Sequence, residues 1–545
     1  MKTHFLALAA LLAAAPASAD TLISNVNGIQ VGANGKMQQF RAMTITDDGR
    51  VGQVIEHPEL VRLANITATI DGSGRTLLPG LIDAHGHVMG LGHAAVRLDL
   101  TGAGSLQELQ ARLKDYAGAN PEARWIVGRG WNQESWPVKN FPTSADLDAV
   151  VKDRPVVLTR VDGHALVANS AAMRAAGVTA ATPVPVGGQI DNGLFVDNAM
   201  GLIESKVPAP TAAEDDVALA TAQQVLLGYG LTAVADMGTS RTGWQAMDRL
   251  GKSGRLKIRI MAYAAGIEAM PAKPSGWLFG DRLNMGGVKL YADGALGSRG
   301  AWLKRPYADK PDTVGLRFLS DTELRDQASK AAGMGFQIAI HAIGDAANAQ
   351  VISVFEQLGN GDRRSRIEHV QVIDPADIPR IAKAGIIASM QPTHQTSDRL
   401  MAEKRLDPPR LQGAYAWQTI EKSGARLAFG SDFPVESPNP FPGLAAAISR
   451  QDTAGQPPGG WRPEERVGFE TALAGFTRNA AFAGFAEDRI GSLEPGKWAD
   501  FILIDRDPTK VDPQALAATQ VLETWVAGKK VWQRAAPIAG AERGK

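Results

Sequence analysis

The stretch Thr76–Leu91, TLLPGLIDAHGHVMGL, decides the fold of this chain. It begins as an apolar run, Leu77–Ile82, of the kind that forms a strand buried on both faces. A polar cluster with His85 and His87 follows directly. Because side chains alternate along a strand, the two imidazoles point to the same side and together can bind one metal ion. The alternative is a pair of loop histidines without a ligand, which is the commoner case for an isolated His-x-His.

The chain that follows repeats the same pattern of apolar strands separated by helical segments, which predicts a parallel β/α architecture. Eight such units predict an α/β fold with a closed (β/α)8 TIM-like barrel, whose site lies at the carboxyl ends of the strands. The predicted strands are Leu77–Ile82, Thr232–Ala235, Lys257–Tyr263, Gly287–Tyr291, Gln337–His341, Arg366–Val370, Ile386–Gln391 and Arg426–Gly430. Polar residues gather at or just past their ends: His85, His87, Asp236, Lys289, His341, His369, Gln391 and Asp432.

The predicted barrel spans residues 76–484, and three further segments accompany it. Residues 20–75 and 485–545 both contain short strands with hairpin-type turns, and we expect them to form one small β-sandwich from the two chain ends. The connection at residues 92–228 is far longer than a βαβ unit of about 30 residues. It contains strand-like runs of its own, so we interpret it as an inserted α/β subdomain over the mouth of the barrel.

Composition narrows the classes of function. The 545 residues contain 57 Lys+Arg and 57 Asp+Glu, so the net charge gives no sign of a nucleic-acid partner. There is no cysteine, which excludes a thiol nucleophile, a thiolate metal ligand and disulfides. A homodimer is an assembly that the sequence leaves open.

The first residues resemble an export signal. Lys2 precedes an apolar run, Phe5–Ala15, and Ala17-Ser18-Ala19 has the small-x-small pattern of a cleavage site. We therefore predict a signal peptide at residues 1–19 and a periplasmic or secreted protein that starts at Asp20. A first core helix is the alternative. No other stretch approaches about 18 consecutive apolar residues, so no transmembrane helix is expected.

Longer motifs reveal a family resemblance. They are PGLIDAHGHVMGLG, DGHALVANS, GLTAVADMG, GGVKLYADGALGSRGAW, IHAIGDAAN, RIEHVQ, SMQPTHQTSDR, FGSDFPVESPNPF and GSLEPGKWADFILID. With these motifs the chain resembles the amidohydrolase superfamily, and more closely amidohydrolase family 3, which includes N-substituted formamide deformylase-like proteins. The resemblance covers essentially the whole mature chain. It implies a (β/α)8 barrel, a flanking β-sandwich and hydrolysis of a C–N bond by metal-activated water.

The resemblance also implies roles for single residues. His85 and His87 would bind the more buried metal, and His341 and His369 the second metal. Lys289 falls where family members often carry a carboxylated lysine that bridges two metals. A lysine paired with a carboxylate such as Asp293 is the alternative, and one metal instead of two stays open. Zinc suits these ligands, although iron, manganese or nickel would also fit.

Asp432 would touch the metal and act as general base, because a carboxylate beside a dication stays ionised at neutral pH. His394 could orient the substrate or stabilise an oxyanion, and His369 is also among the candidate catalytic groups. The candidate substrate contacts are Trp131, Asn132, His164 and Tyr291, with structural packing as the alternative for each.

The function predicted from these residues is an exported, metal-dependent amidohydrolase for a small N-acyl or N-formyl compound. An esterase or lactonase on the same site is one alternative, since activated water also attacks esters. A metal-binding or solute-binding protein that has lost catalysis is the other. The complete set of histidines, Lys289 and Asp432 argues against this last alternative.

Overall fold

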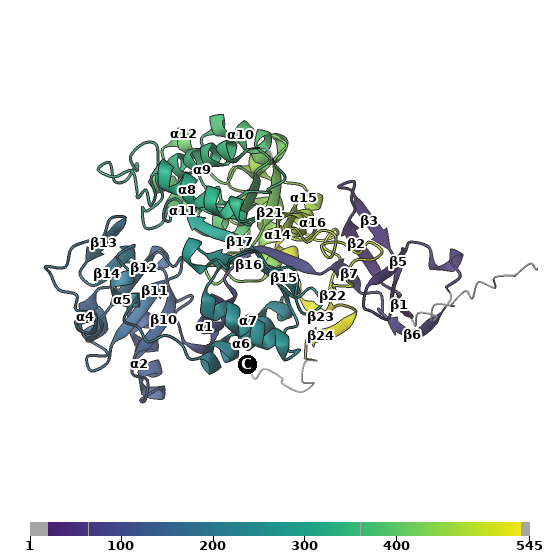
Figure 1. Cartoon of the computed structure of the whole chain (residues 1–545), viewed down its shortest axis with the longest axis horizontal. Coiled ribbons are helices and arrows are strands. Elements are labelled where there is room, and N and C mark those ends of the chain that lie inside the picture. Colours follow the sequence, from purple (N-terminus) through teal and green to yellow (C-terminus); the bar gives the residue numbers. More distant parts are fainter. Residues whose placement is uncertain (1–19, 64, 360, 536–545) are drawn as a thin grey trace, which may run out of the picture.

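The computed structural model describes residues 20–63, 65–359 and 361–535, and an eight-stranded parallel sheet lies at its centre (Figure 1). Neighbours in this sheet follow chain order, from β8 to β21, so the predicted (β/α)8 barrel is confirmed. Its strands are β8 (Leu81–Gly86), β15 (Leu231–Thr239), β16 (Arg259–Ala265), β17 (Leu283–Tyr291), β18 (Gln337–Ala342), β19 (Arg366–His369), β20 (Ile387–Met390) and β21 (Arg426–Phe429).

The barrel closes between its first and last strands through the loop that carries Asp432. The Asp432 amide donates to the His85 carbonyl at 2.7 Å, and the His87 amide donates to the Phe433 carbonyl at 2.8 Å. Gly86 is required at this seam, because a Cβ there would lie 2.3 Å from the Phe433 ring. The closure therefore fixes the Asp432 backbone beside the two histidines of the first strand.

The first predicted strand has to be corrected. Leu77–Ile82 is two strands, because the chain passes from one sheet to another at Gly80. β7 (Thr76–Pro79) pairs with β2 (Asn27–Val31) and β22 (Phe501–Ile504) in a separate sheet, and the barrel strand starts at Leu81. His85 consequently lies inside β8, and His87 directly precedes α1 (Val88–Val96).

Strands from both chain ends share a six-stranded sheet, as predicted, and N-terminal strands alone form a further four-stranded sheet (Figure 1). The six-stranded sheet contains β2, β3 (Met37–Phe40), β7, β22, β23 (Val521–Val526) and β24 (Lys529–Gln533). The four-stranded sheet contains β1 (Asp20–Ser24), β4 (Ala42–Ile45), β5 (Val51–Ile55) and β6 (Ile66–Asp71). A buried pair joins these strands to the barrel, since Arg259 donates to both carboxylate oxygens of Asp500 at 2.6 and 2.9 Å.

The long connection between β8 and β15 forms a sheet of its own on one side of the barrel (Figure 1). Its strands are β9 (Leu98–Asp99), β10 (Ile126–Trp131), β11 (Val156–Arg160), β12 (Ala165–Ala168), β13 (Gly188–Asp191) and β14 (Leu194–Asp197). Its helices are α2 (Leu106–Ala119), α3 (Ser144–Asp148), α4 (Ser170–Ala176) and α5 (Gly201–Glu204). The chain then returns to the barrel through α6 (Ala212–Gly228), which packs on α1.

The remaining helices connect the barrel strands or follow the last of them. They are α7 (Arg241–Lys252), α8 (Asp321–Gly333), α9 (Asp345–Leu358), α10 (Ile378–Lys383), α11 (Pro392–Arg405), α12 (Pro408–Leu411), α13 (Trp417–Lys422), α14 (Pro440–Ser449), α15 (Phe469–Gly475), α16 (Arg478–Ala483) and α17 (Pro513–Ala517). Within the described residues, none of the helices combines the length and the apolar character that a membrane crossing needs.

Candidate metal centre

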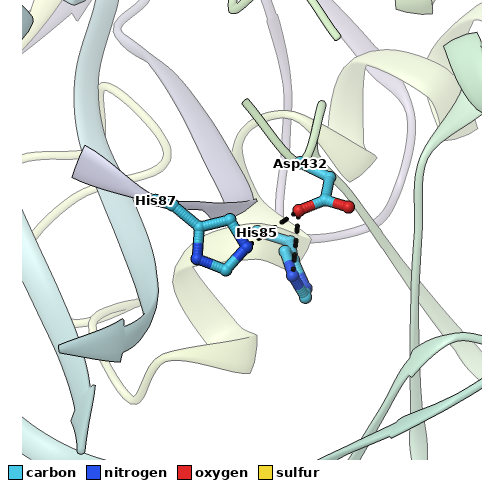
Figure 2. Close-up of side chains that lie close together, drawn as sticks. All are labelled: His85, His87 and Asp432. Atoms are coloured by element: carbon cyan, nitrogen blue, oxygen red, sulfur yellow. Dashed lines mark ion pairs between the residues drawn. The ribbon is translucent and has the colours of Figure 1, made fainter. Parts of the chain in front are cut away.

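His85, His87 and Asp432 meet at the closing seam of the barrel (Figure 2). One oxygen of Asp432, Oδ1, lies 3.0 Å from His87 Nε2 and 3.4 Å from His85 Nε2. The His85 side chain is fully buried, whereas that of His87 is 32 % exposed. The strand and the closing loop thus place two imidazole nitrogens and a carboxylate around one point.

A second group shares the same aspartate. His369, which ends β19, and His394 in α11 lie with Asp432 within metal-binding distance of one another. Asp432 Oδ2 is 3.8 Å from His394 Nε2. The ring of His369 is 4.7 Å from that of His85 and 4.6 Å from that of His341. Histidines from three barrel strands and from α11 therefore gather near Asp432, and His394, predicted only as a catalytic candidate, is part of the possible ligand set.

Hydrogen bonds on the far side of the rings orient two of these histidines. His85 Nδ1 lies 2.6 Å from Glu368 Oε2, and His369 Nδ1 lies 2.8 Å from Gln391 Oε1. Such bonds fix the tautomer and leave Nε2 free to coordinate a metal. Burial also lowers the pKa of His85 to about 4, and the pKa values of His369 and His341 fall well below their usual value. All three are therefore neutral imidazoles, the form that binds metals.

Glu368 is a residue that the sequence reasoning missed. It is fully buried, and Arg366 donates to both of its oxygens, at 2.7 and 3.1 Å. Burial raises the pKa of this carboxyl, but the charge of Arg366 and the hydrogen bond from His85 outweigh burial and hold the pKa far below its usual range. The signal was available in Arg366-Ile367-Glu368-His369, where two opposite charges occupy one face of a predicted core strand.

Lys289 contacts the same centre. Its Nζ lies 3.3 Å from His85 Nε2 and 4.9 Å from the centre of the Tyr291 ring, and burial lowers its pKa to about 8. The alternative pair with Asp293 is not formed among the described residues. Asp293 instead accepts hydrogen bonds from the backbone N–H groups of Trp302, Ile343 and Gly344. The amine is thus placed beside the ligands without a carboxylate partner.

The residues present fit a divalent cation. His341 Nε2 and His394 Nε2 are buried and have no hydrogen-bond partner in the described part of the chain. Buried polar atoms are normally satisfied, so orphaned ones at one place indicate a missing ligand. Burial opposes ionisation of Asp432, but His85, His87 and His369 keep its pKa well below the usual value. The donors are neutral nitrogens and an anionic oxygen, which zinc and similar ions accept.

Two of the predicted substrate contacts reach this centre. His164, in the turn between β11 and β12, has its ring 5.4 Å from that of His341, and its Nδ1 lies 2.7 Å from Asp197 Oδ1. Burial alone would lower the pKa of His164, but Asp197 and other carboxylates outweigh the effect of burial. The net result is a raised pKa. Tyr291 is 37 % exposed, and its ring is 5.4 Å from that of His341. The insertion thus contributes His164 to the mouth of the barrel.

Trp131 and Asn132 occupy a different place. Trp131 is fully buried in the core of the insertion, where its Nε1 donates to the Leu158 carbonyl at 2.7 Å and its ring contacts Phe141. The indole of Trp131 therefore packs inside the insertion in this structure, and its role as a substrate contact stays a prediction. Asn132 accepts from the Glu134 amide and from Arg160 at 3.1 Å, so it holds a turn together.

Comparison with known proteins agrees with this geometry. The sequence model described as amidohydrolase family matches residues 68–532. The chain is 33 % identical to LONG AFTER FAR-RED 3 of Arabidopsis thaliana, covering 86 % of this chain and 84 % of that protein. It is 26 % identical to N-substituted formamide deformylase of Arthrobacter pascens, covering 94 % of this chain and 98 % of that protein.

Solved structures show the same relationship. A metal-dependent hydrolase of Pyrococcus horikoshii superposes with a TM-score of 0.75 at 28 % identity, over 91 % of this chain and 99 % of that one. A metal-dependent hydrolase of Pyrococcus furiosus superposes with a TM-score of 0.71 at 29 % identity, over 90 % of this chain and 100 % of that one. With the family match over most of its length and histidines and an aspartate gathered at the barrel mouth, this chain belongs to the amidohydrolase family, as a metal-dependent hydrolase.

Proposed function

We propose that this protein hydrolyses a non-peptide C–N bond, in a small N-acyl or N-formyl compound, with Asp432 as the proton-transfer group. The observation that carries the proposal is the position of Asp432, whose two oxygens lie between His85, His87 and His394 at 3.0 to 3.8 Å. The relative named N-substituted formamide deformylase aligns over 98 % of its own length, which supports a C–N bond as the target.

His85, His87, His341, His369 and Asp432 would hold the metal, together with Lys289 as its carbamate. A divalent cation bound here would supply Lewis-acid polarisation of a carbonyl and lower the pKa of water from 15.7 to about 7. Zinc is the ion we expect from the nitrogen and oxygen donors.

The residues of the chain then have separate tasks. Asp432 is ionised and accepts the proton of the attacking water at a carboxylate oxygen, and it returns that proton to the leaving nitrogen. His394, 3.8 Å from Asp432, has a buried Nε2 without a hydrogen-bond partner among the described residues and can bind the carbonyl oxygen or the leaving group. Glu368 holds the His85 ring in place.

Removal and return of metal test the proposal. Protein treated with a chelator should lose activity toward N-formyl amines and N-acyl amino acids, and zinc should restore it. The same panel should include aryl esters, because an ester preference would favour the esterase alternative. Full activity in rigorously metal-free protein, or no hydrolysis of any amide by zinc-loaded protein, would contradict the proposal.

A further inference from the structure

Arg129, near the end of β10, is a cation that forms no ion pair with any of the described residues. Its Nη2 donates to the Val161 carbonyl at 2.6 Å, and this is the only hydrogen bond of its side chain within the described ranges. Its Nε is buried and has no acceptor there, and none of the ion pairs in the described part of the chain includes Arg129. A guanidinium offers five N–H groups and stays charged at neutral pH, so most of its binding capacity is unused.

The neighbouring arginine shows the contrast. Arg160, at the end of β11, is buried and pairs with Asp162, and it also donates to Gln133 at 2.9 Å and to Asn132 at 3.1 Å. Asp162 is thus already engaged by Arg160. The two arginines at the ends of these adjacent strands therefore differ in their partners. Arg160 has an ion pair and two further side-chain hydrogen bonds, whereas the Arg129 side chain has one hydrogen bond to a carbonyl.

Arg129 lies next to the turn that contributes His164 to the metal centre. Its guanidinium lies against the turn between β11 and β12, with Nη1 3.6 Å from the place where a Gly163 Cβ would be. The next residue in that turn is His164, whose ring is 5.4 Å from that of His341. Burial lowers the pKa of Arg129, and the charges of Asp432 and Asp162 oppose that effect, so the guanidinium lies within the electrostatic reach of Asp432.

We infer that Arg129 binds a carboxylate carried by the substrate, so that the hydrolysed compound is an anionic amide such as an N-acylated amino acid. Arginine and carboxylate form parallel charge-assisted hydrogen bonds, which would satisfy the unused N–H groups. A substrate with a carboxylate at Arg129 would extend its amide toward the histidines around Asp432. This inference rests on the proposed function for the reaction, but the binding of the carboxylate does not depend on hydrolysis.

The test compares matched ligands that differ only in charge, using the full-length, zinc-loaded protein. N-formylglycine and N-formylglycinamide report on turnover, and N-methylsulfonylglycine and its primary amide report on binding by calorimetry, because a sulfonamide is not cleaved as an amide. For wild-type protein we expect the carboxylate member of each pair to be preferred at least about tenfold in kcat/KM and in affinity.

Arg129→Gln should abolish both preferences, and Arg129→Lys should keep part of them, because lysine keeps the charge but not the planar fork. Arg112→Gln is the matched control, since Arg112 lies on α2 of the same insertion and pairs with Glu108 at the surface. Each preference is a ratio within one protein sample, so partial unfolding or partial metal loss does not mimic the effect.

Two outcomes would overturn the inference: a wild-type protein that binds both sulfonamides equally, or an Arg129→Gln variant that keeps the wild-type ratios. The same experiment can contradict the proposed function without contradicting the inference about Arg129. If neither formyl compound were hydrolysed while the charged sulfonamide still bound through Arg129, the carboxylate site would stand and the assigned reaction would be wrong.

Discussion

Glu368 Oε2 lies 2.6 Å from His85 Nδ1, and both side chains are completely buried, although the two residues are 283 positions apart in the sequence. The contact links the sixth strand of the barrel to the first across its interior. It fixes which nitrogen of His85 faces Asp432, because the protonated Nδ1 donates to the carboxylate and Nε2 is left for a ligand.

Glu368→Gln should therefore weaken metal binding without touching a metal ligand. Loss of a carboxylate that orients a ligating histidine typically costs about 10- to 100-fold in affinity. Arg366 would also lose its buried counter-charge, so a lower melting temperature is expected. Competition with a chelator gives the affinity, and Glu356→Gln, at the surface pair with Arg380, is the control. Unchanged metal affinity in the Glu368 variant would mean that Glu368 only neutralises the charge of Arg366 and does not affect the metal site.

Asp432→Asn should reduce kcat by about 10²- to 10⁴-fold or more, because an amide cannot accept the proton. Asparagine suits the position, since the backbone there has a φ of 60° and asparagine tolerates the left-handed region better than most residues. Zinc content and melting temperature should change little. Metal analysis must accompany the assay. If the metal-replete variant turned over at nearly the wild-type rate, another group such as His394 would be the proton shuttle.

We propose that Lys289 is carboxylated in the metal-loaded protein. Its pKa is lowered to about 8 by burial, so the unprotonated amine, which is the form that reacts with CO2, becomes more abundant as the pH of metal-free protein rises through that value. Reloading with zinc in bicarbonate should consequently be faster above this pH than below it. Intact mass under native conditions should show one added CO2 that Lys289→Arg lacks. An unmodified Lys289 in fully loaded, active protein would leave a mechanism without the carbamate.

Trp131→Ala should destabilise the insertion rather than change substrate ranking directly. Removal of a buried tryptophan typically costs about 3–5 kcal/mol, through lost packing and the cavity left behind. Thermal unfolding and limited proteolysis of residues 98–197 measure the effect. Val186→Ala, at a residue of the same insertion that is 89 % exposed, is the control. A changed order of substrates with an unchanged melting temperature would instead support Trp131 as a substrate contact.

We further propose that the protein is exported and that its mature form begins at Asp20. The predicted signal peptide, residues 1–19, lies outside the described residues, and the first described strand starts at Asp20. N-terminal sequencing of natively expressed protein, together with fractionation of the cells, is the measurement. A chain that begins at Met1 or Lys2 would contradict the proposal.

Much of the barrel could be predicted from local pattern. Most of the strands are short apolar runs that end at or just before a polar residue, and parallel strands bring their carboxyl ends to one edge. His85, His341, His369 and Asp432 were therefore identifiable as neighbours from their positions alone. The residue types at those positions also determined the kind of ligand, because imidazole and carboxylate suit the same divalent ions.

Tertiary structure decided what local pattern could not. The division of Leu77–Ile82 at Gly80 depends on β7 pairing with β2 and with β22, which comes from the far end of the chain. The burial of Trp131 depends on packing inside the insertion, and the contact of Glu368 with His85 depends on closure of the barrel. Local sequence determines which segments are strands and which side chains end them, whereas partners distant in sequence are set by long-range packing. For that reason the sequence by itself determined the ligand types of the metal centre, and only the folded chain decided which groups orient them and which arginine forms no ion pair with the described residues.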